Sequence, residues 1–174
     1  CSLNAGEDRF SLCCIMEING KGEILSHDIK KAIINVNRRM SYAVVYDLLT
    51  NENSQYYEEY KDLVPMFKEM ENLRNILLRK RQKRGAIEFE SEEAKIILDE
   101  KGKPVDIVKR ERNVATSIIE EFMLAANETV AEHFYWLEVP FVYRTHEVPD
   151  EEKYDKLQLL VTPFGYVLKG SSKH

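Results

Sequence analysis

The sequence predicts a mixed α+β fold, with antiparallel strands and hairpins packed with several long helices. Apolar segments on both sides of the turn Asn19-Gly20-Lys21-Gly22 indicate a hairpin. From Gln55 onward, apolar residues recur at steps of three and four, the spacing of one buried helix face. Strand and helix signals follow one another in neither a regular βαβ series nor a bundle. With 174 residues and 44% hydrophobic content, the chain is long enough for one domain with its own core.

The N-terminal elements follow from this turn. Residues 10–18 are apolar and are expected to form the first strand, and residues 23–30 the second. Apolar residues continue beyond the second strand, but their alternation is too loose to assign each one. Ser41 is in position to cap a short helix that carries Val44, Val45, Leu48 and Leu49.

A long helical segment is expected between residues 55 and 84. Pro65 lies inside it and either kinks the helix or starts a second one, because proline cannot donate to the preceding turn. The basic run at residues 79–84 complements the negative pole of a helix end, and Gly85 suits the C-cap. The buried face is expected to hold Tyr56, Tyr60, Leu63, Phe67, Met70, Leu73 and Leu77.

The second half of the chain is expected to add a hairpin and two helices. The strands are residues 93–98 and 105–109, and a long helix follows from about 113 to 137. A short strand is expected at residues 141–143. A last helix is expected to start at Pro149, since proline and acidic residues suit a first turn. The inner face of the long helix is expected to hold Ile118, Phe122, Ala125, Thr129, Val130, His133 and Leu137.

Charge and cysteine content restrict the class of protein and the cellular compartment that the sequence fits. A net charge of -5 argues against a general DNA-coating protein, although seven basic residues lie between Lys68 and Arg84. The three cysteines cannot form a disulfide framework and fit a reducing cytoplasm. The apolar runs are too short to span a membrane, and no signal peptide precedes the first strand. The chain opens at Cys1 without a start methionine, which favours a cut inside a larger protein.

The basic run and the segment after it predict an RNA channel. Arg81, Lys83 and Arg84 precede Phe89, whose ring on an extended segment could stack on any base. These residues are therefore the candidate RNA-binding residues, with single-stranded RNA as the partner. The alternatives are a solvated helix end for the basic run and a core strand position for Phe89.

Helix geometry separates two neighbouring carboxylates on the long helix. The expected inner face turns Glu120 away and leaves Glu121 on its border, where a carboxylate can reach a cleft. A surface ion pair is the common alternative. Tyr42 is a further candidate, because its ring could pack at a helix start or its hydroxyl could face a phosphate.

Several kinds of catalytic site have no sequence support. Cys13 and Cys14 lack zinc spacing, the histidines are scattered, and no P-loop or dinucleotide motif occurs. No close carboxylate cluster for a catalytic metal is found, since the acids at residues 150–155 are expected only to favour the helix dipole. No metal site is therefore predicted in this chain.

At these residues the chain resembles the RNB catalytic domain of the ribonuclease II / ribonuclease R exoribonucleases, and most of all the ribonuclease R branch. The matching segments are Cys1-Ser2-Leu3-Asn4, Glu7-Asp8-Arg9, Arg39-Met40-Ser41-Tyr42, Arg84-Gly85-Ala86-Ile87-Glu88-Phe89, Ala94-Lys95-Ile96-Ile97-Leu98, Ile119-Glu120-Glu121-Phe122-Met123-Leu124-Ala125-Ala126-Asn127, His146-Glu147-x-Pro149 and Phe164-Gly165.

The resemblance implies an enzyme that degrades RNA processively from the 3′ end to nucleoside 5′-monophosphates with magnesium (Mg2+). The family's metal-binding aspartates precede the Cys-Ser-Leu-Asn strand, and its later arginine motif would follow His174, so neither is in this chain. By matching motifs, Tyr42 is the active-site tyrosine and Phe89 the aromatic that clamps the terminal bases. The active-site glutamate falls in the Glu120-Glu121 pair, where the helix phase favours Glu121 as the catalytic residue. Phe122 stands where the family often has cysteine or alanine.

Residues 1–174 are then expected to be the central part of a single RNB-type domain, truncated at both ends. The parent protein is expected to be a cytoplasmic, monomeric exoribonuclease with flanking RNA-binding domains, and to bind neither DNA nor a membrane. The fragment alone is expected to be inactive. The alternative is a non-catalytic RNA-binding or assembly module of a degenerate nuclease.

Overall fold

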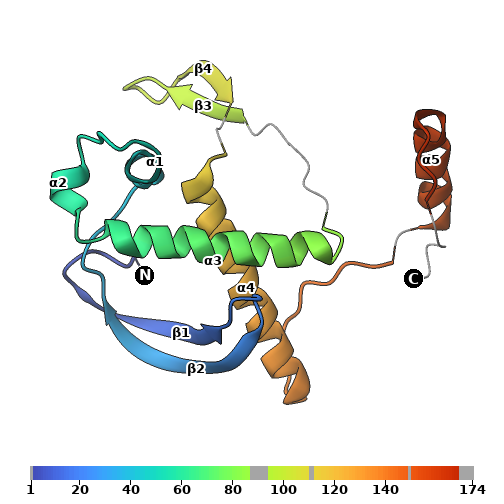
Figure 1. Cartoon of the computed structure of the whole chain (residues 1–174), viewed down its shortest axis with the longest axis horizontal. Coiled ribbons are helices and arrows are strands. Elements are labelled where there is room, and N and C mark those ends of the chain that lie inside the picture. Colours follow the sequence, from blue (N-terminus) through green and yellow to red (C-terminus); the bar gives the residue numbers. More distant parts are fainter. Residues whose placement is uncertain (1, 87–93, 110–111, 149, 169–174) are drawn as a thin grey trace. The chain divides into compact units, whose positions relative to one another are not determined.

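The computed structural model describes residues 2–86, 94–109, 112–148 and 150–168. They fall into two compact units, Cys1–Leu137 and Glu138–His174. Helices are combined with small antiparallel sheets, so the predicted α+β class is confirmed (Figure 1). None of the helices in the described ranges has the length and apolarity needed to cross a bilayer.

The first unit begins with the predicted hairpin. Strand β1 (Asp8–Ile18) pairs antiparallel with β2 (Ile24–Asn35), which extends the predicted second strand by several residues. The side chain of Asn19 closes the turn, because its Oδ1 accepts from the backbone N–H groups of Lys21 and Glu23 at 2.9 and 3.0 Å. Gly22 follows with φ of +77°, a conformation that side-chain-bearing residues rarely adopt.

Three helices surround the apolar core of this unit. In α1 (Tyr42–Thr50) the Ser41 hydroxyl accepts from the backbone N–H of Val44, which confirms the predicted cap. Helix α2 (Tyr57–Tyr60) is short, and α3 (Val64–Lys83) starts with Pro65 in its first turn, so the proline begins a second helix. The core consists of Leu48, Val64 and Phe67, with Met40, Val44, Val45, Leu49, Tyr56, Tyr60, Leu63 and Met70 around them.

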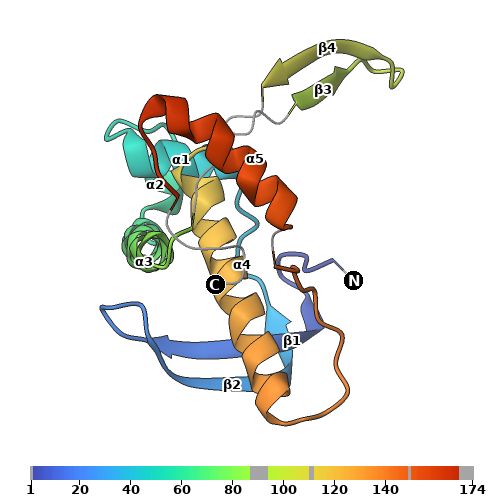
Figure 2. The ribbon, with the colours of Figure 1, turned by 90° about the vertical axis from the view of Figure 1, so that its right-hand side faces the viewer.

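Helix α4 (Val114–Trp136) packs against α3 and α1, and Figures 1 and 2 show it crossing α3. A reciprocal cap starts it, since the Asn113 side chain accepts from Thr116 N–H and the Thr116 hydroxyl accepts from Asn113 N–H. Its buried residues are Ala115, Ser117, Ile118, Glu121 and Thr129.

This buried stripe corrects the predicted helix phase. The sequence predicts Glu121 on the border of the inner face, but its side chain lies within the buried stripe, whereas Phe122 and Val130 are only half-buried. The prediction was wrong because it placed no carboxylate inside the buried face. A carboxylate can be buried when a cation of another element neutralises it, and Arg81 does so here.

The remaining strands of the first unit form a second hairpin. Strands β3 (Ala94–Leu98) and β4 (Pro104–Lys109) pair antiparallel, as predicted. The Asp99 carboxylate closes their turn by accepting from the backbone N–H groups of Lys101 and Lys103.

The second unit contains α5 (Glu151–Val161) and a short 3-10 helix, η1 (Thr162–Phe164). The Asp150 side chain caps α5 by accepting from Glu152 N–H and Lys153 N–H, which confirms the predicted helix. The predicted strand at residues 141–143 is wrong, because this segment pairs with no strand in the described part of the chain. Its apolar residues indicated a strand, but a strand needs a hydrogen-bonding neighbour.

Candidate nucleic-acid interface

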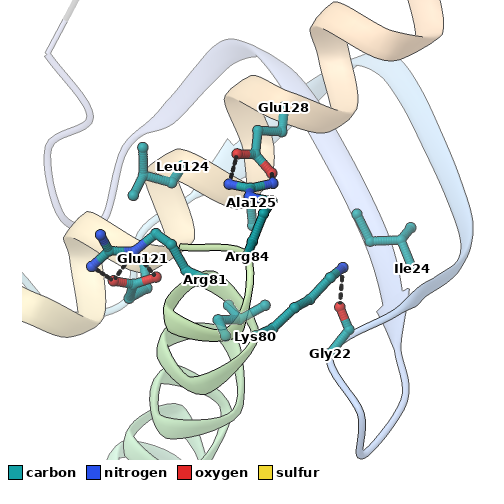
Figure 3. Close-up of a pocket in the computed structure, with 10 residues that line it drawn as sticks. Gly22, Ile24, Lys80, Arg81, Arg84, Glu121, Leu124, Ala125 and Glu128 are labelled. Atoms are coloured by element: carbon teal, nitrogen blue, oxygen red, sulfur yellow. Dashed lines mark hydrogen bonds and ion pairs between the residues drawn. The ribbon is translucent and has the colours of Figure 1, made fainter. Parts of the chain in front are cut away.

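The end of α3 meets α4 and the β1–β2 turn around a shallow, open pocket (Figure 3). Cationic residues of α3 face carboxylates of α4 across it, with apolar side chains between them. The lining residues are Gly22, Ile24, Leu77, Lys80, Arg81, Arg84, Glu121, Leu124, Ala125 and Glu128. One wall of this pocket is therefore formed by three residues of the predicted basic run, Lys80, Arg81 and Arg84.

Inside the pocket, Arg81 and Glu121 form a buried ion pair. Arg81 Nε and Nη2 donate to Glu121 Oε1 at 3.1 and 2.7 Å, and Nε also approaches Oε2 at 3.3 Å. The side chains are only 19% and 2% exposed, respectively. A carboxylate this deeply buried depends on its cation, because desolvation penalises an unpaired charge.

At the pocket rim, Arg84 and Glu128 form a second and more exposed ion pair. Arg84 Nη1 and Nη2 donate to the two carboxylate oxygens of Glu128 at 3.2 and 2.7 Å, a two-pronged arrangement (Figure 3). The side chains are 59% and 55% exposed. Hydrogen bonding to Glu128 and its negative charge raise the pKa of Arg84, so the guanidinium stays charged.

The β1–β2 turn is fastened to the same helix end. Lys80 Nζ donates to the backbone carbonyl of Gly22 at 2.7 Å. A Cβ at Gly22 would lie 3.2 Å from Ile76 Cγ2 and 3.3 Å from Lys80 Cδ, so the close approach leaves little room for a side chain. The Lys80 ammonium is therefore hydrogen-bonded to the hairpin turn.

The structure brings together only part of the predicted site. Arg81, Arg84 and Glu121 share the pocket, but both arginines are paired with glutamates. Lys83 is exposed at the end of α3 and does not line the pocket. Phe89 lies outside the described residues.

Tyr42 and Glu120 lie elsewhere on the first unit. Tyr42 begins α1, is 46% exposed and does not line the pocket, so the structure leaves this side chain accessible. Glu120 is exposed and pairs with Arg112, with Nη2 at 2.8 Å from Oε2. The prediction that Glu120 points outward is confirmed.

Glu128 is the pocket residue that the sequence reasoning missed. It lies seven residues after Glu121, and this spacing places both on one helix face, where they meet Arg81 and Arg84. This seven-residue spacing could have indicated from the sequence that Glu128 lies on the same helix face as Glu121. However, the match to the arginines depends on a contact between two helices that are distant in sequence.

The described residues do not fit a metal ion. Within residues 2–86, 94–109, 112–148 and 150–168, no group of three or more histidine, cysteine, aspartate or glutamate side chains is placed so that it could hold a metal ion. The pocket carboxylates Glu121 and Glu128 are occupied by guanidinium groups. The described residues therefore supply no chemical step through Mg2+.

Comparison with known proteins decides the family. The family model described as RNB domain matches residues 1–172. The chain belongs to the RNB domain family. This RNB chain is 43% identical over 175 residues to ribonuclease R of Thermotoga maritima, an alignment that covers 99% of this chain and 24% of the relative. It is 40% identical over 172 residues to ribonuclease R 1 of Lactococcus lactis subsp. lactis, covering 99% and 21%.

A solved structure agrees with the sequence relatives. The RNB chain resembles Mycoplasma genitalium RNase R in complex with ribose-methylated single-stranded RNA, with a TM-score of 0.83 and 29% identity. The match covers 95% of this chain and 25% of that one. The predicted resemblance to ribonuclease R is thus confirmed, and the chain spans about a quarter or less of the length of these relatives.

Proposed function

We propose that residues 1–174 are the central part of the catalytic domain of a longer hydrolytic exoribonuclease. In this enzyme the chain forms one wall of the RNA channel, and RNA is degraded from its 3′ end to nucleoside 5′-monophosphates. The observation that carries the proposal is the RNB match over residues 1–172, together with the ribonuclease R relatives.

The RNA-facing part of this wall is proposed to be the end of α3 and the segment after it. Lys83 and Arg84 are exposed and cationic, and both charges can meet phosphates. Phe89, which lies outside the described residues, is proposed to stack on a terminal base. Single-stranded RNA is the proposed ligand, because the similar Mycoplasma genitalium RNase R forms a complex with ribose-methylated single-stranded RNA.

For Arg81 and Glu121 we propose a positioning role. Both are largely buried and bind each other, so neither presents a free charge at the pocket surface. Their pair holds the end of α3 on α4 and thereby fixes where Lys83 and Arg84 lie. Tyr42, by contrast, is proposed to act directly, through an accessible side chain whose hydroxyl can donate to a phosphate or to the attacking water.

Mg2+ is proposed as the cofactor of the longer enzyme, with its ligands outside the described residues. Such an ion would lower the pKa of bound water and neutralise charge in hydrolysis. We therefore expect the 174-residue chain alone to bind labelled single-stranded RNA weakly and not to shorten it. Shortening of the RNA that a chelator abolishes would contradict this expectation.

The positioning role can be tested in the longer enzyme. Glu121→Ala is expected to lower the single-turnover rate at saturating RNA by roughly ten- to a thousandfold, the range of groups that position or transfer protons. Tyr42→Phe should act in the same direction but less strongly. Glu120→Ala is the matched control, because Glu120 is exposed and lies next in sequence, and it should be nearly silent.

Melting temperatures separate loss of function from loss of fold. A rate defect of Glu121→Ala that persists well below its melting temperature supports positioning of the RNA contacts. Tyr42→Phe with unchanged rate and stability would limit Tyr42 to packing. A Glu120 defect larger than the Glu121 defect at equal stability would contradict the assignment.

The alternative to the enzyme is a non-catalytic protein of the same family. The chain would then be an RNA-binding or assembly module of a degenerate nuclease. RNA degradation by the longer protein with Mg2+ would decide for the enzyme, and binding without degradation would decide for the module. We further propose that the enzyme is a cytoplasmic monomer, which cell fractionation and sedimentation of the longer protein would test.

A further inference from the structure

The two ion pairs between α3 and α4 differ in how easily another anion could replace the glutamate. Arg81–Glu121 is buried, whereas both members of Arg84–Glu128 are more than half exposed. Solvent and salt screen an exposed pair, so it contributes little to stability and exchanges readily. The Arg84 guanidinium can therefore leave Glu128 without disturbing the packing below it.

A phosphate group can take the place of the Glu128 carboxylate. Glu128 presents two oxygens to two nitrogens of Arg84, at 2.7 and 3.2 Å. A phosphodiester offers two equivalent non-bridging oxygens, and guanidinium groups bind phosphate in the same two-pronged way. Lys83, the preceding residue, adds a second exposed cation at this end of α3.

We propose that Glu128 is an intramolecular competitor of RNA for Arg84. Without RNA its carboxylate occupies the guanidinium, and an RNA phosphate displaces it on binding. The carboxylate thereby lowers the affinity of this helix end for any polyanion, which limits non-productive binding. This inference rests on the proposed RNA-binding function and assigns Glu128 a role in setting RNA affinity.

Equilibrium binding of a short, fluorescently labelled oligouridylate to the 174-residue chain tests the proposal at low salt. Four variants are compared with the wild type: Glu128→Gln, Arg84→Gln, the double variant and Glu120→Gln. Glu120→Gln is the matched control, because it makes the same charge change on α4 and also removes an exposed glutamate–arginine pair. Thermal melting establishes that each variant is folded.

Glu128→Gln is expected to tighten binding roughly two- to fivefold, the range set by the strength of exposed ion pairs. Glu120→Gln should change the dissociation constant much less. In the Arg84→Gln background, Glu128→Gln should change the dissociation constant no more than Glu120→Gln does, because there is no Arg84 guanidinium left to release. High salt should reduce all these differences.

The outcomes separate this inference from the proposed function. If RNA binds but Glu128→Gln equals Glu120→Gln, or keeps its gain without Arg84, competition is overturned and RNA binding stands. If only Glu128→Gln binds measurably, the competition is stronger than expected. If neither the wild type nor Glu128→Gln binds, the RNA-binding proposal fails, and the inference fails with it.

Discussion

The two ends of α3 are held by different forces. Its first turns bury Val64 and Phe67 against Leu48 of α1, in a core without charged members. Its last turns are joined to α4 by Arg81–Glu121 and Arg84–Glu128. Apolar burial is insensitive to other charges, whereas ion pairs depend on both partners and on salt. The end that we propose to meet RNA is therefore the end with exchangeable contacts.

The largest effect is expected at the apolar end. Phe67→Ala should lower the free energy of unfolding by about 3–5 kcal/mol, because it removes a buried ring and leaves a cavity. Met66→Ala is the matched control, since Met66 is the neighbouring residue and is exposed. Urea denaturation of both variants measures the difference. Equal losses would show that Phe67 does not anchor this end of the helix.

At the last turns of α3, removing one partner of the buried ion pair should lower the free energy of unfolding nearly as much as Phe67→Ala does. Arg81→Ala leaves the Glu121 carboxylate buried without its cation, which should lower the free energy of unfolding by about 2–4 kcal/mol. Replacing both residues, as in Arg81→Met with Glu121→Leu, should restore part of this loss. Arg84→Ala, at the exposed pair, should cost less than about 1 kcal/mol.

The contrast between the two arginines is measurable in one denaturation series. Similar losses for Arg81→Ala and Arg84→Ala would mean that burial does not distinguish the pairs. The proposal that only the outer pair exchanges with RNA would then lose its structural basis. A double variant less stable than Arg81→Ala would instead indicate that the carboxylate has a further stabilising partner.

Sequence reasoning succeeded where structure is fixed by neighbouring residues. The turn at Asn19, the cap at Ser41 and the helix start at Pro65 are local, and the structure has all of them. Burial of Glu121 could not be predicted this way, because its cation is 40 residues distant in sequence. The strand expected at residues 141–143 was wrong for the same kind of reason, since pairing depends on a distant partner.

A smaller loss of stability is expected from a substitution in the β1–β2 turn, where it contacts the last turns of α3. Gly22→Ala is expected to lower the free energy of unfolding by about 1–2 kcal/mol, because φ of +77° disfavours a side chain. The new Cβ would also crowd Ile76 and Lys80 of α3. Gly20→Ala, in the same turn but with open space around its Cβ, is the control and should cost less. Equal melting temperatures for the two variants would show that neither the φ of Gly22 nor its closeness to Ile76 and Lys80 disfavours a side chain at this position.

The smallest effect is expected from a carboxylate beside the apolar end. Ser54 and Asn51 donate hydrogen bonds to the Asp47 side chain, and these bonds lower the pKa of that carboxyl. Because the folded pKa lies below the unfolded value of about 3.9, the charged form stabilises the fold above that pH. The stabilisation is lost as the pH falls through the folded pKa.

Asp47→Asn should therefore melt at a lower temperature than the wild type at pH 7, and this difference in melting temperature should disappear in strong acid. Asp62→Asn, a change of the same charge at an exposed position, is the control. A gap that stays constant with pH would show that the Asp47 hydrogen bonds do not depend on its charge, so that this end of α3 is insensitive to pH as well as to other charges.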